Sequence, residues 1–133
     1  MTEFNRKEVL QMIAAVPIAE GNQINFAGFD LSGLDLSLVN LSDADLSDAN
    51  LEGTDLRGAD LDRAILNGVA FQGADLREAV LSRAELVDAD LSGAILINAD
   101  LSEANLTGAI LTGADQDGVI LTGATMPDGT KHA

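Results

Sequence analysis

The chain has 133 residues, a formal net charge of −15 and no cysteine. This length suits a single domain, and the absence of thiols excludes disulfides, thiolate metal sites and a cysteine nucleophile. The acidic balance disfavours nucleic acid and anionic membranes as partners, because both are polyanions.

Targeting signals are not evident in the sequence. No apolar run approaches the 18 residues that a membrane helix needs, and the N-terminus lacks the basic stretch and apolar core of a signal peptide. We therefore expect a cytoplasmic protein without a membrane partner. Hydrophobic residues make up 47% of the chain, and their strict periodicity argues against disorder.

The N-terminal segment 2–16 is predicted to form a short helix. Thr2 can serve as the N-cap, and Glu3 lies in the first turn, where an acidic side chain is favourable. Pro17 is expected to end the helix, because the residue before a proline is pushed out of the α region.

One face of this predicted helix carries an apolar stripe. It consists of residues at the spacing i, i+3, i+4, i+7, namely Val9, Met12, Ile13 and Val16. Such a stripe is typical of a face that packs on the rest of the protein. A membrane-surface or partner helix is the alternative, but the segment is short and carries only Arg6 and Lys7 as cations.

From Gly21 to Met126 the chain repeats one five-residue pattern without a break. Starting at Phe26, Leu occupies 17 of 21 central positions, here named i. Position i−2 is small and apolar, i−1 is mostly Asp or Asn, i+1 is most often Ser or Thr, and i+2 is Gly in 11 cases. A period of five fits neither an amphipathic helix nor an alternating strand. A chain that turns a corner every five residues would place i−2 and i inside.

Glycine at i+2 suits a corner where φ is positive or where a Cβ would be crowded. Other residues also occupy this position, among them Leu38, Arg63 and Glu78. Not every corner can therefore require glycine.

The motif Ala-(Asp/Asn)-Leu-x-x, as in residues 44–48 and 99–103, resembles the pentapeptide repeat family over residues 22–126. The resemblance implies an all-β solenoid, the right-handed quadrilateral β-helix, with four pentapeptides in each coil. Twenty-one repeats would then make just over five coils with a length of roughly 24 Å. The expected organisation is a capping helix and connector at 1–21, the β-helix at 22–126 and a tail at 127–133.

Residues 20 apart should stack in such a solenoid, so its two ends can be compared. The i−2 positions of the first coil are bulky where later coils have mostly Ala: Ile24, Phe29, Leu34 and Val39. We expect the N-terminal helix to cover this widened coil, because an open edge invites pairing. No comparable cap follows Met126, which predicts a monomer or a dimer through the C-terminal end. Gln116 replaces Leu in the last coil and is expected to be a polar plug at that open end.

The sequence offers no arrangement suited to catalysis. Acidic residues are abundant, but a convex prism lacks the cleft that a catalytic carboxylate pair needs. His132 is the only histidine and lies in the tail, which excludes a triad or a multi-histidine metal site. Asp35, Asp55 and Asp75 should stack, yet a single column coordinates calcium poorly. We therefore expect no catalytic residue, no metal and no cofactor.

The four cations of the repeat region form two pairs of residues 20 apart, Arg57 with Arg77 and Arg63 with Arg83. They are expected to form two stacked pairs that flank one corner. Residues 20 apart from Arg63 and Arg83 extend this pair to the column Asp43, Arg63, Arg83, Glu103. Each Arg in this column therefore has an acid next to it. The simpler interpretation is a salt-bridge ladder that relieves repulsion, and the alternative is an interaction edge for an acidic partner.

The sequence thus predicts a rigid, non-catalytic module that binds or organises another protein. DNA mimicry is the alternative, because some pentapeptide repeat proteins resemble duplex DNA and protect DNA gyrase from quinolones. Four Arg against 18 carboxylates give the repeat region a charge of −14, and duplex DNA of this length carries roughly 14 phosphates. Against mimicry, the resemblance implies that gyrase-binding members are longer, have a C-terminal dimerisation module or carry loops, all of which this chain lacks.

Overall fold

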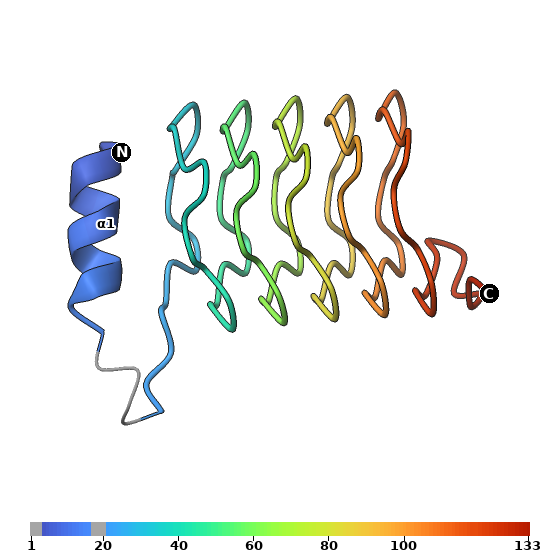
Figure 1. The fold of residues 1–133 in the computed structure, drawn as a ribbon, viewed down its shortest axis with the longest axis horizontal. Coiled ribbons are helices and arrows are strands. Elements are labelled where there is room, and N and C mark those ends of the chain that lie inside the picture. The colour runs from blue at the N-terminus through green and yellow to red at the C-terminus, as the bar shows by residue number, and fades with distance from the viewer. Residues whose placement is uncertain (1–3, 17–20) are drawn as a thin grey trace.

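The computed structural model describes residues 4–16 and 21–133. One helix, α1 (Arg6–Ala14), lies at one end of a solenoid of stacked coils, and the C-terminus lies at the other end (Figure 1). The described residues form no continuous strand. Isolated parallel bridges instead join each i−1 residue to the one 20 positions later, from Asn25↔Asp45 to Asn105↔Thr125. Four pentapeptides therefore make one coil.

Each repeat ends in a β-turn that forms a corner of the solenoid. The N–H of residue i+3 donates to the carbonyl of residue i, as from Ala44 to Leu41 at 3.1 Å. Residue i+2 has a positive φ in every turn from 28 to 123, and nine of these residues are not glycine. The positive φ explains the frequent glycine, and Leu38 and Arg63 show that the turn forms at φ near +60° without it.

Backbone hydrogen bonds hold successive coils together along all four sides. The N–H of Leu46 donates to Ile65 at 2.8 Å, that of Asp48 to Asn67 at 3.0 Å, and that of Asp45 to Ile24 at 2.8 Å. Between these ladders the Leu and Ala side chains at i and i−2 are buried in one continuous core. The core therefore runs along the whole axis of the solenoid.

The preference for Asp or Asn at i−1 has a local cause. The side chain of Asp45 accepts hydrogen bonds from the N–H of Ser47 at 2.9 Å and from its hydroxyl at 2.6 Å. This Asx arrangement recurs around the solenoid and satisfies a backbone donor that the turn leaves unpaired. Where Glu85 replaces Asp or Asn, the N–H of Val87 instead donates to Asn67 of the preceding coil at 2.9 Å.

Thr54 is a buried polar exception at an i−2 position. Its side chain is fully buried, and its hydroxyl donates to the carbonyl of Leu31 in the preceding coil at 3.1 Å. A hydroxyl can therefore replace the usual Ala methyl, because a backbone acceptor of the neighbouring coil is within reach.

The predicted N-cap at Thr2 is wrong. α1 begins after Asn5, whose side chain accepts the N–H of Glu8 at 2.8 Å, while the Glu8 carboxylate accepts the N–H of Asn5 at 3.2 Å. This capping box sets the start of the helix. Thr2, Glu3 and Pro17 lie outside the described residues.

The apolar side of α1 packs on the first coil. Val9 is fully buried, and Met12, Ile13 and Val16 are partly buried against the core of the solenoid. In the first coil, Ile24 and Val39 are buried, while Phe29 and Leu34 are half-buried. The ring of Phe4 also stacks on Phe29, with the ring centroids 5.1 Å apart.

Arg6 completes this end of the solenoid in a way that the sequence analysis missed. In an inner coil the carbonyls of Asp55 and Arg57 accept N–H groups from the coil before. The first coil has no preceding coil, and its equivalent carbonyls accept the guanidinium of Arg6, Asp35 at 2.7 Å and Ser37 at 3.1 Å. The two arms of one guanidinium thus replace two backbone donors.

Replacing Arg6 by Met is therefore expected to lower the free energy of unfolding by about 1 kcal/mol, because hydrogen bonds from a partly exposed guanidinium contribute less than buried ones. Lys7→Met removes the same charge from the neighbouring residue and is expected to change stability by less than about 0.5 kcal/mol. Urea denaturation measures both variants. Equal effects of the two substitutions would show that Arg6 acts only through its charge.

The C-terminal end is only partly covered. Residues 130–132 fold back along one side, where Gly123 donates to His132 at 3.1 Å and His132 donates to Ala124 at 2.7 Å. The described residues provide no hydrogen-bond acceptor for the N–H groups of Leu111, Gly113, Gln116, Gly118 and Leu121, which in an inner coil would donate to the next coil. The side chain of Gln116 is exposed, so its amide faces solvent and is not buried.

Candidate functional site

The four Arg residues lie at two neighbouring corners, so the prediction that they flank one corner is wrong. Arg57 and Arg77 lie in the turns that begin at 56 and 76, whereas Arg63 and Arg83 lie in the next turns, which begin at 61 and 81. Position i+1 of one repeat and i+2 of the following repeat belong to successive turns. The two pairs therefore flank one face of the solenoid.

Arg57 and Arg77 each bind the carboxylate of their own repeat with two nitrogens. Nε and Nη2 of Arg57 donate to Asp55 at 2.9 and 2.7 Å, and those of Arg77 donate to Asp75 at 2.9 and 2.6 Å. Nε of Arg57 also lies 4.0 Å from Asp75 of the next coil. The first pair is thus a ladder of ion pairs along the corner.

The acidic column of Asp35, Asp55 and Asp75 is neutralised by this arrangement. Arg6 lies 3.2 Å from Asp35, so each of the three carboxylates has a guanidinium partner. The hydrogen bonds from Arg57 and Arg77 hold the pKa of Asp55 and Asp75 below its ordinary value. Within residues 4–16 and 21–133, no group of His, Cys, Asp and Glu is suited to hold a metal ion.

The second pair shares one carboxylate. Asp62 lies 3.0 Å from Arg83 and 3.7 Å from Arg63, and its side chain also accepts the hydroxyl of Ser82 at 2.7 Å. Burial alone would raise the pKa of Asp62, but the hydrogen bonds from Ser82 and Arg83 outweigh it and the pKa is lowered. The expected pairing with Asp43 and Glu103 is wrong, because the described residues give neither of these acids an ion pair.

These pKa directions predict loss of stability in acid. A carboxyl whose folded pKa is lowered contributes stability above its unfolded pKa of about 3.9, and this contribution disappears as the pH falls through the folded value. We expect urea midpoints that are level above about pH 5 and fall below about pH 4, with a shallower fall for the double variant Asp55→Asn, Asp75→Asn. A midpoint that rises on acidification would show that relief of the −15 charge dominates.

Leu38 is the feature of this surface that the sequence analysis missed as a site. Its side chain is 80% exposed, and its backbone has a φ of +63°. It lies over Gly58 of the next coil, where an added Cβ would be 2.7 Å from the Leu38 Cδ2 atom. The signal was present in the sequence, because Leu38 is the only large apolar residue at any i+2 position.

Leu38 and the first Arg pair border one shallow depression of about 400 Å³. Its lining consists of Ser37, Leu38, Arg57, Gly58, Arg77 and Glu78. An exposed aliphatic group, two guanidiniums and one carboxylate, that of Glu78, therefore meet at one corner of the solenoid.

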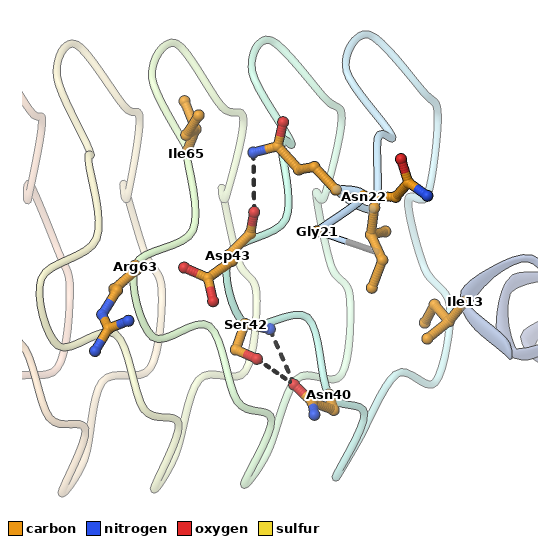
Figure 2. Close-up of a pocket in the computed structure, with 10 residues that line it drawn as sticks. Ile13, Gly21, Asn22, Asn40, Ser42, Asp43, Arg63 and Ile65 are labelled. Carbon is orange, nitrogen blue, oxygen red and sulfur yellow. Dashed lines mark hydrogen bonds between the residues drawn. The ribbon is translucent and has the colours of Figure 1, made fainter. Parts of the chain in front are cut away.

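A larger depression of about 650 Å³ lies between Ile13 of α1 and the first three coils. Figure 2 shows its side chains spread along neighbouring coils, with no common point toward which they converge. Several polar groups there already serve the fold, since Gln23 donates to the carbonyl of Asp43 at 2.9 Å and Asn40 accepts the hydroxyl of Ser42 at 2.7 Å. Of the two depressions, this one is therefore the weaker candidate for a binding site.

No helix in the described part of the chain has the length and apolar character required to cross a membrane.

Comparisons with known proteins agree with the repeat. The family model described as pentapeptide repeats matches residues 22–58, 44–83 and 84–124 in eight copies. No curated protein matches the chain. A solved pentapeptide repeat protein from the Arabidopsis thaliana thylakoid lumen is 31% identical, with a TM-score of 0.53, over 83% of this chain and 70% of that one.

Two further solved structures are similar at lower TM-scores. The pentapeptide repeat protein Rfr23 from the cyanobacterium Cyanothece 51142 is 28% identical over 83% of this chain and 88% of its own, with a TM-score of 0.48. The plasmid-mediated fluoroquinolone resistance protein QnrB1 is 21% identical over 77% of this chain and 72% of its own, with a TM-score of 0.24.

The family model alone covers most of the chain, and the repeat that it matches is the one that forms the coils. The protein therefore belongs to the pentapeptide repeat family, whose members fold as right-handed quadrilateral β-helices.

Proposed function

We propose that the protein is a rigid, non-catalytic module that binds or organises a partner protein. The observation that carries this proposal is the structural use of its surface carboxylates. The pKa lies below its ordinary value in seven Asp side chains: Asp30, Asp35, Asp55, Asp62, Asp75, Asp90 and Asp128. A general acid needs the opposite shift, toward neutral pH.

The cause of these shifts is local and repeats along the solenoid. Asp30 and Asp90 have a lowered pKa because each accepts the hydroxyl of the Ser two residues later. These carboxylates hold turns in place, so the chain presents a regular wall of fixed side chains. A rigid wall favours binding, because little conformational entropy is lost when a partner docks.

The proposal is tested by replacing Asp30, Asp90 and Asp100 with Asn in one variant. Asn occupies the same position in other repeats, as at Asn40, and its carbonyl oxygen accepts the hydroxyl of Ser42 in the same way. We expect the variant to stay folded with a somewhat lower melting temperature at neutral pH, because an amide oxygen accepts the Ser hydroxyl less strongly than a carboxylate does, and to capture the same proteins from a lysate of the source organism. The proposal would be contradicted if the wild type captured no protein, or if the variant without the three carboxylates no longer captured the proteins that the wild type binds.

DNA mimicry ranks second. The charge of −14 over the repeat region favours it, whereas the guanidiniums on Asp35, Asp55, Asp62 and Asp75 cancel charge on two neighbouring corners. A supercoiling assay separates the two functions. We expect DNA gyrase to be unaffected by micromolar protein, and inhibition that a charge-matched control protein does not cause would reverse the ranking.

We also propose that any self-association uses the C-terminal end. α1 covers the opposite end, whereas in the last coil several N–H groups have no acceptor among the described residues and the side chains of Ile110 and Ile120 are half-exposed. Sedimentation over a concentration series tests this point. Ile120→Lys should keep the protein monomeric at concentrations where the wild type dimerises, while Leu10→Lys on α1 should not. A dimer that survives Ile120→Lys would place the contact elsewhere.

A further inference from the structure

We propose that the corner formed by Leu38, Arg57 and Arg77 binds a segment of the partner protein in which an acidic side chain neighbours an aliphatic one. This inference rests on the proposed binding function and adds to it a surface and the chemistry of the bound segment.

Leu38 is unfavourable for the isolated protein in two respects. Its side chain is 80% exposed, and its φ of +63° is a region that bulky residues rarely adopt. Eleven of the equivalent corner positions have glycine instead, which adopts the same backbone without strain. Because the turn does not need this leucine, a contact outside the chain is the better explanation for it.

The two guanidiniums next to Leu38 are held in place and still have donors to offer. Each uses Nε and Nη2 on the carboxylate of its own repeat, Asp55 or Asp75. The described residues give the Nη1 atoms of Arg57 and Arg77 no hydrogen-bond partner. Each guanidinium has five N–H donors, so a second carboxylate can bind at Nη1. The side chains are already ordered, which lowers the entropic cost of that contact.

The shape of the corner fits a short segment. The depression of about 400 Å³ is lined by Leu38, which covers Gly58, by both guanidiniums and by Glu78, so an aliphatic side chain can lie against Leu38 while a neighbouring carboxylate reaches the guanidiniums on the side away from Glu78. The other Arg pair is less suitable, because Arg63 and Arg83 share Asp62. Among the described residues, none of the exposed large apolar side chains adjoins that second pair.

The test is a peptide-display selection with the full chain as bait, followed by fluorescence anisotropy on the enriched peptides. We expect enrichment of peptides that have Asp or Glu next to Leu, Ile or Val. Leu38→Gly and the double variant Arg57→Ser, Arg77→Ser should each weaken binding by about tenfold or more, as expected for central contacts. The matched control Arg63→Ser, Arg83→Ser removes the same charge and should leave the Kd within about twofold.

Loss of folding does not explain the expected result for Leu38→Gly. Glycine relieves the strained φ, so the melting temperature should stay the same or rise while binding is lost. Selected peptides without the acidic and aliphatic pair, or peptides that bind Leu38→Gly as well as the wild type, would overturn the inference. It would also be overturned if Leu38→Gly abolished self-association, which would identify a second copy as the occupant, or weakened binding to a duplex oligonucleotide.

Failure of this inference can be told apart from failure of the proposed function. If Leu38→Gly captures the same lysate proteins as the wild type, the partner binds elsewhere and only the inference fails. If the wild type captures nothing, the proposed binding function itself fails.

Discussion

Phe71→Ala is expected to lower the free energy of unfolding by about 3–5 kcal/mol, which is the usual range for a buried aromatic residue. Phe71 is fully buried in the middle of the solenoid. Its N–H donates to Asp90 of the next coil at 2.8 Å, and the N–H of Leu51 in the preceding coil donates to Ala70 at 2.8 Å. The coils on both sides are therefore fixed by backbone bonds and cannot collapse into the cavity.

The control is Phe71→Leu, which restores the residue that most repeats have at this position. It should cost less than about 1.5 kcal/mol, because the repeat already accommodates leucine in the same backbone. Denaturant unfolding with a constant m-value measures both variants. If both variants lost a similar, large amount of stability, the site would need the aromatic ring itself. If neither variant changed the free energy of unfolding, the coils would have to relax around the cavity.

Ala79→Asp is expected to have the second large effect, a destabilisation of several kcal/mol that unfolds the chain or its central coils. Ala79 is fully buried at an i−2 position, and a carboxylate there would lose its water without gaining a cation. The neighbouring residue Val80 provides a matched control, because it occupies an outward i−1 position where Asp is the usual residue.

Val80→Asp should leave stability unchanged or raise it slightly. The new carboxylate would lie two residues before the N–H of Ser82, as Asp45 does before Ser47, and an Asx bond of this kind stabilises the turn. Circular dichroism and thermal melting distinguish the two variants. Equal destabilisation by Ala79→Asp and Val80→Asp would contradict the assignment of inward and outward positions in this coil.

The two ends of the solenoid solve the same physical problem differently. Each end of a stack of coils exposes backbone groups that inner coils pair with each other. At the N-terminal end α1 covers the core, and Arg6 donates to the carbonyls of Asp35 and Ser37. At the C-terminal end residues 130–132 cover only one side. This difference is why self-association is proposed at the C-terminal end.

Charge on the side walls is also uneven. Guanidiniums offset the column of Asp35, Asp55 and Asp75 and the carboxylate of Asp62. Leu38, whose side chain is 80% exposed, lies beside one of these columns. A uniform acidic prism would favour a mimic of a polyanion, whereas a local site with donors and an apolar group favours recognition of a particular segment.

Much of the fold could be predicted from the order of residues because its interactions are local. The turn bond from Ala44 to Leu41 and the Asx bond from Ser47 to Asp45 each span three residues or fewer. The period of five therefore places Leu and Ala inside and Asp, Asn and Ser outside in each repeat. The same period led directly to the pentapeptide repeat family, which the family model shows.

The candidate site could not be predicted in the same way, because its contacts depend on side-chain conformation between coils and across corners. Asp62 rather than Asp43 or Glu103 binds Arg83, since the guanidinium reaches back to the coil before it. Arg6 finds its acceptors in residues about 30 positions away, which no spacing rule in the helix reveals. In the sequence Leu38 is a single leucine at a corner position. Its exposure and its position over Gly58 are defined only when the coils are stacked. Local periodicity thus accounts for the coils, and the stacking of coils accounts for the surface on which function is proposed.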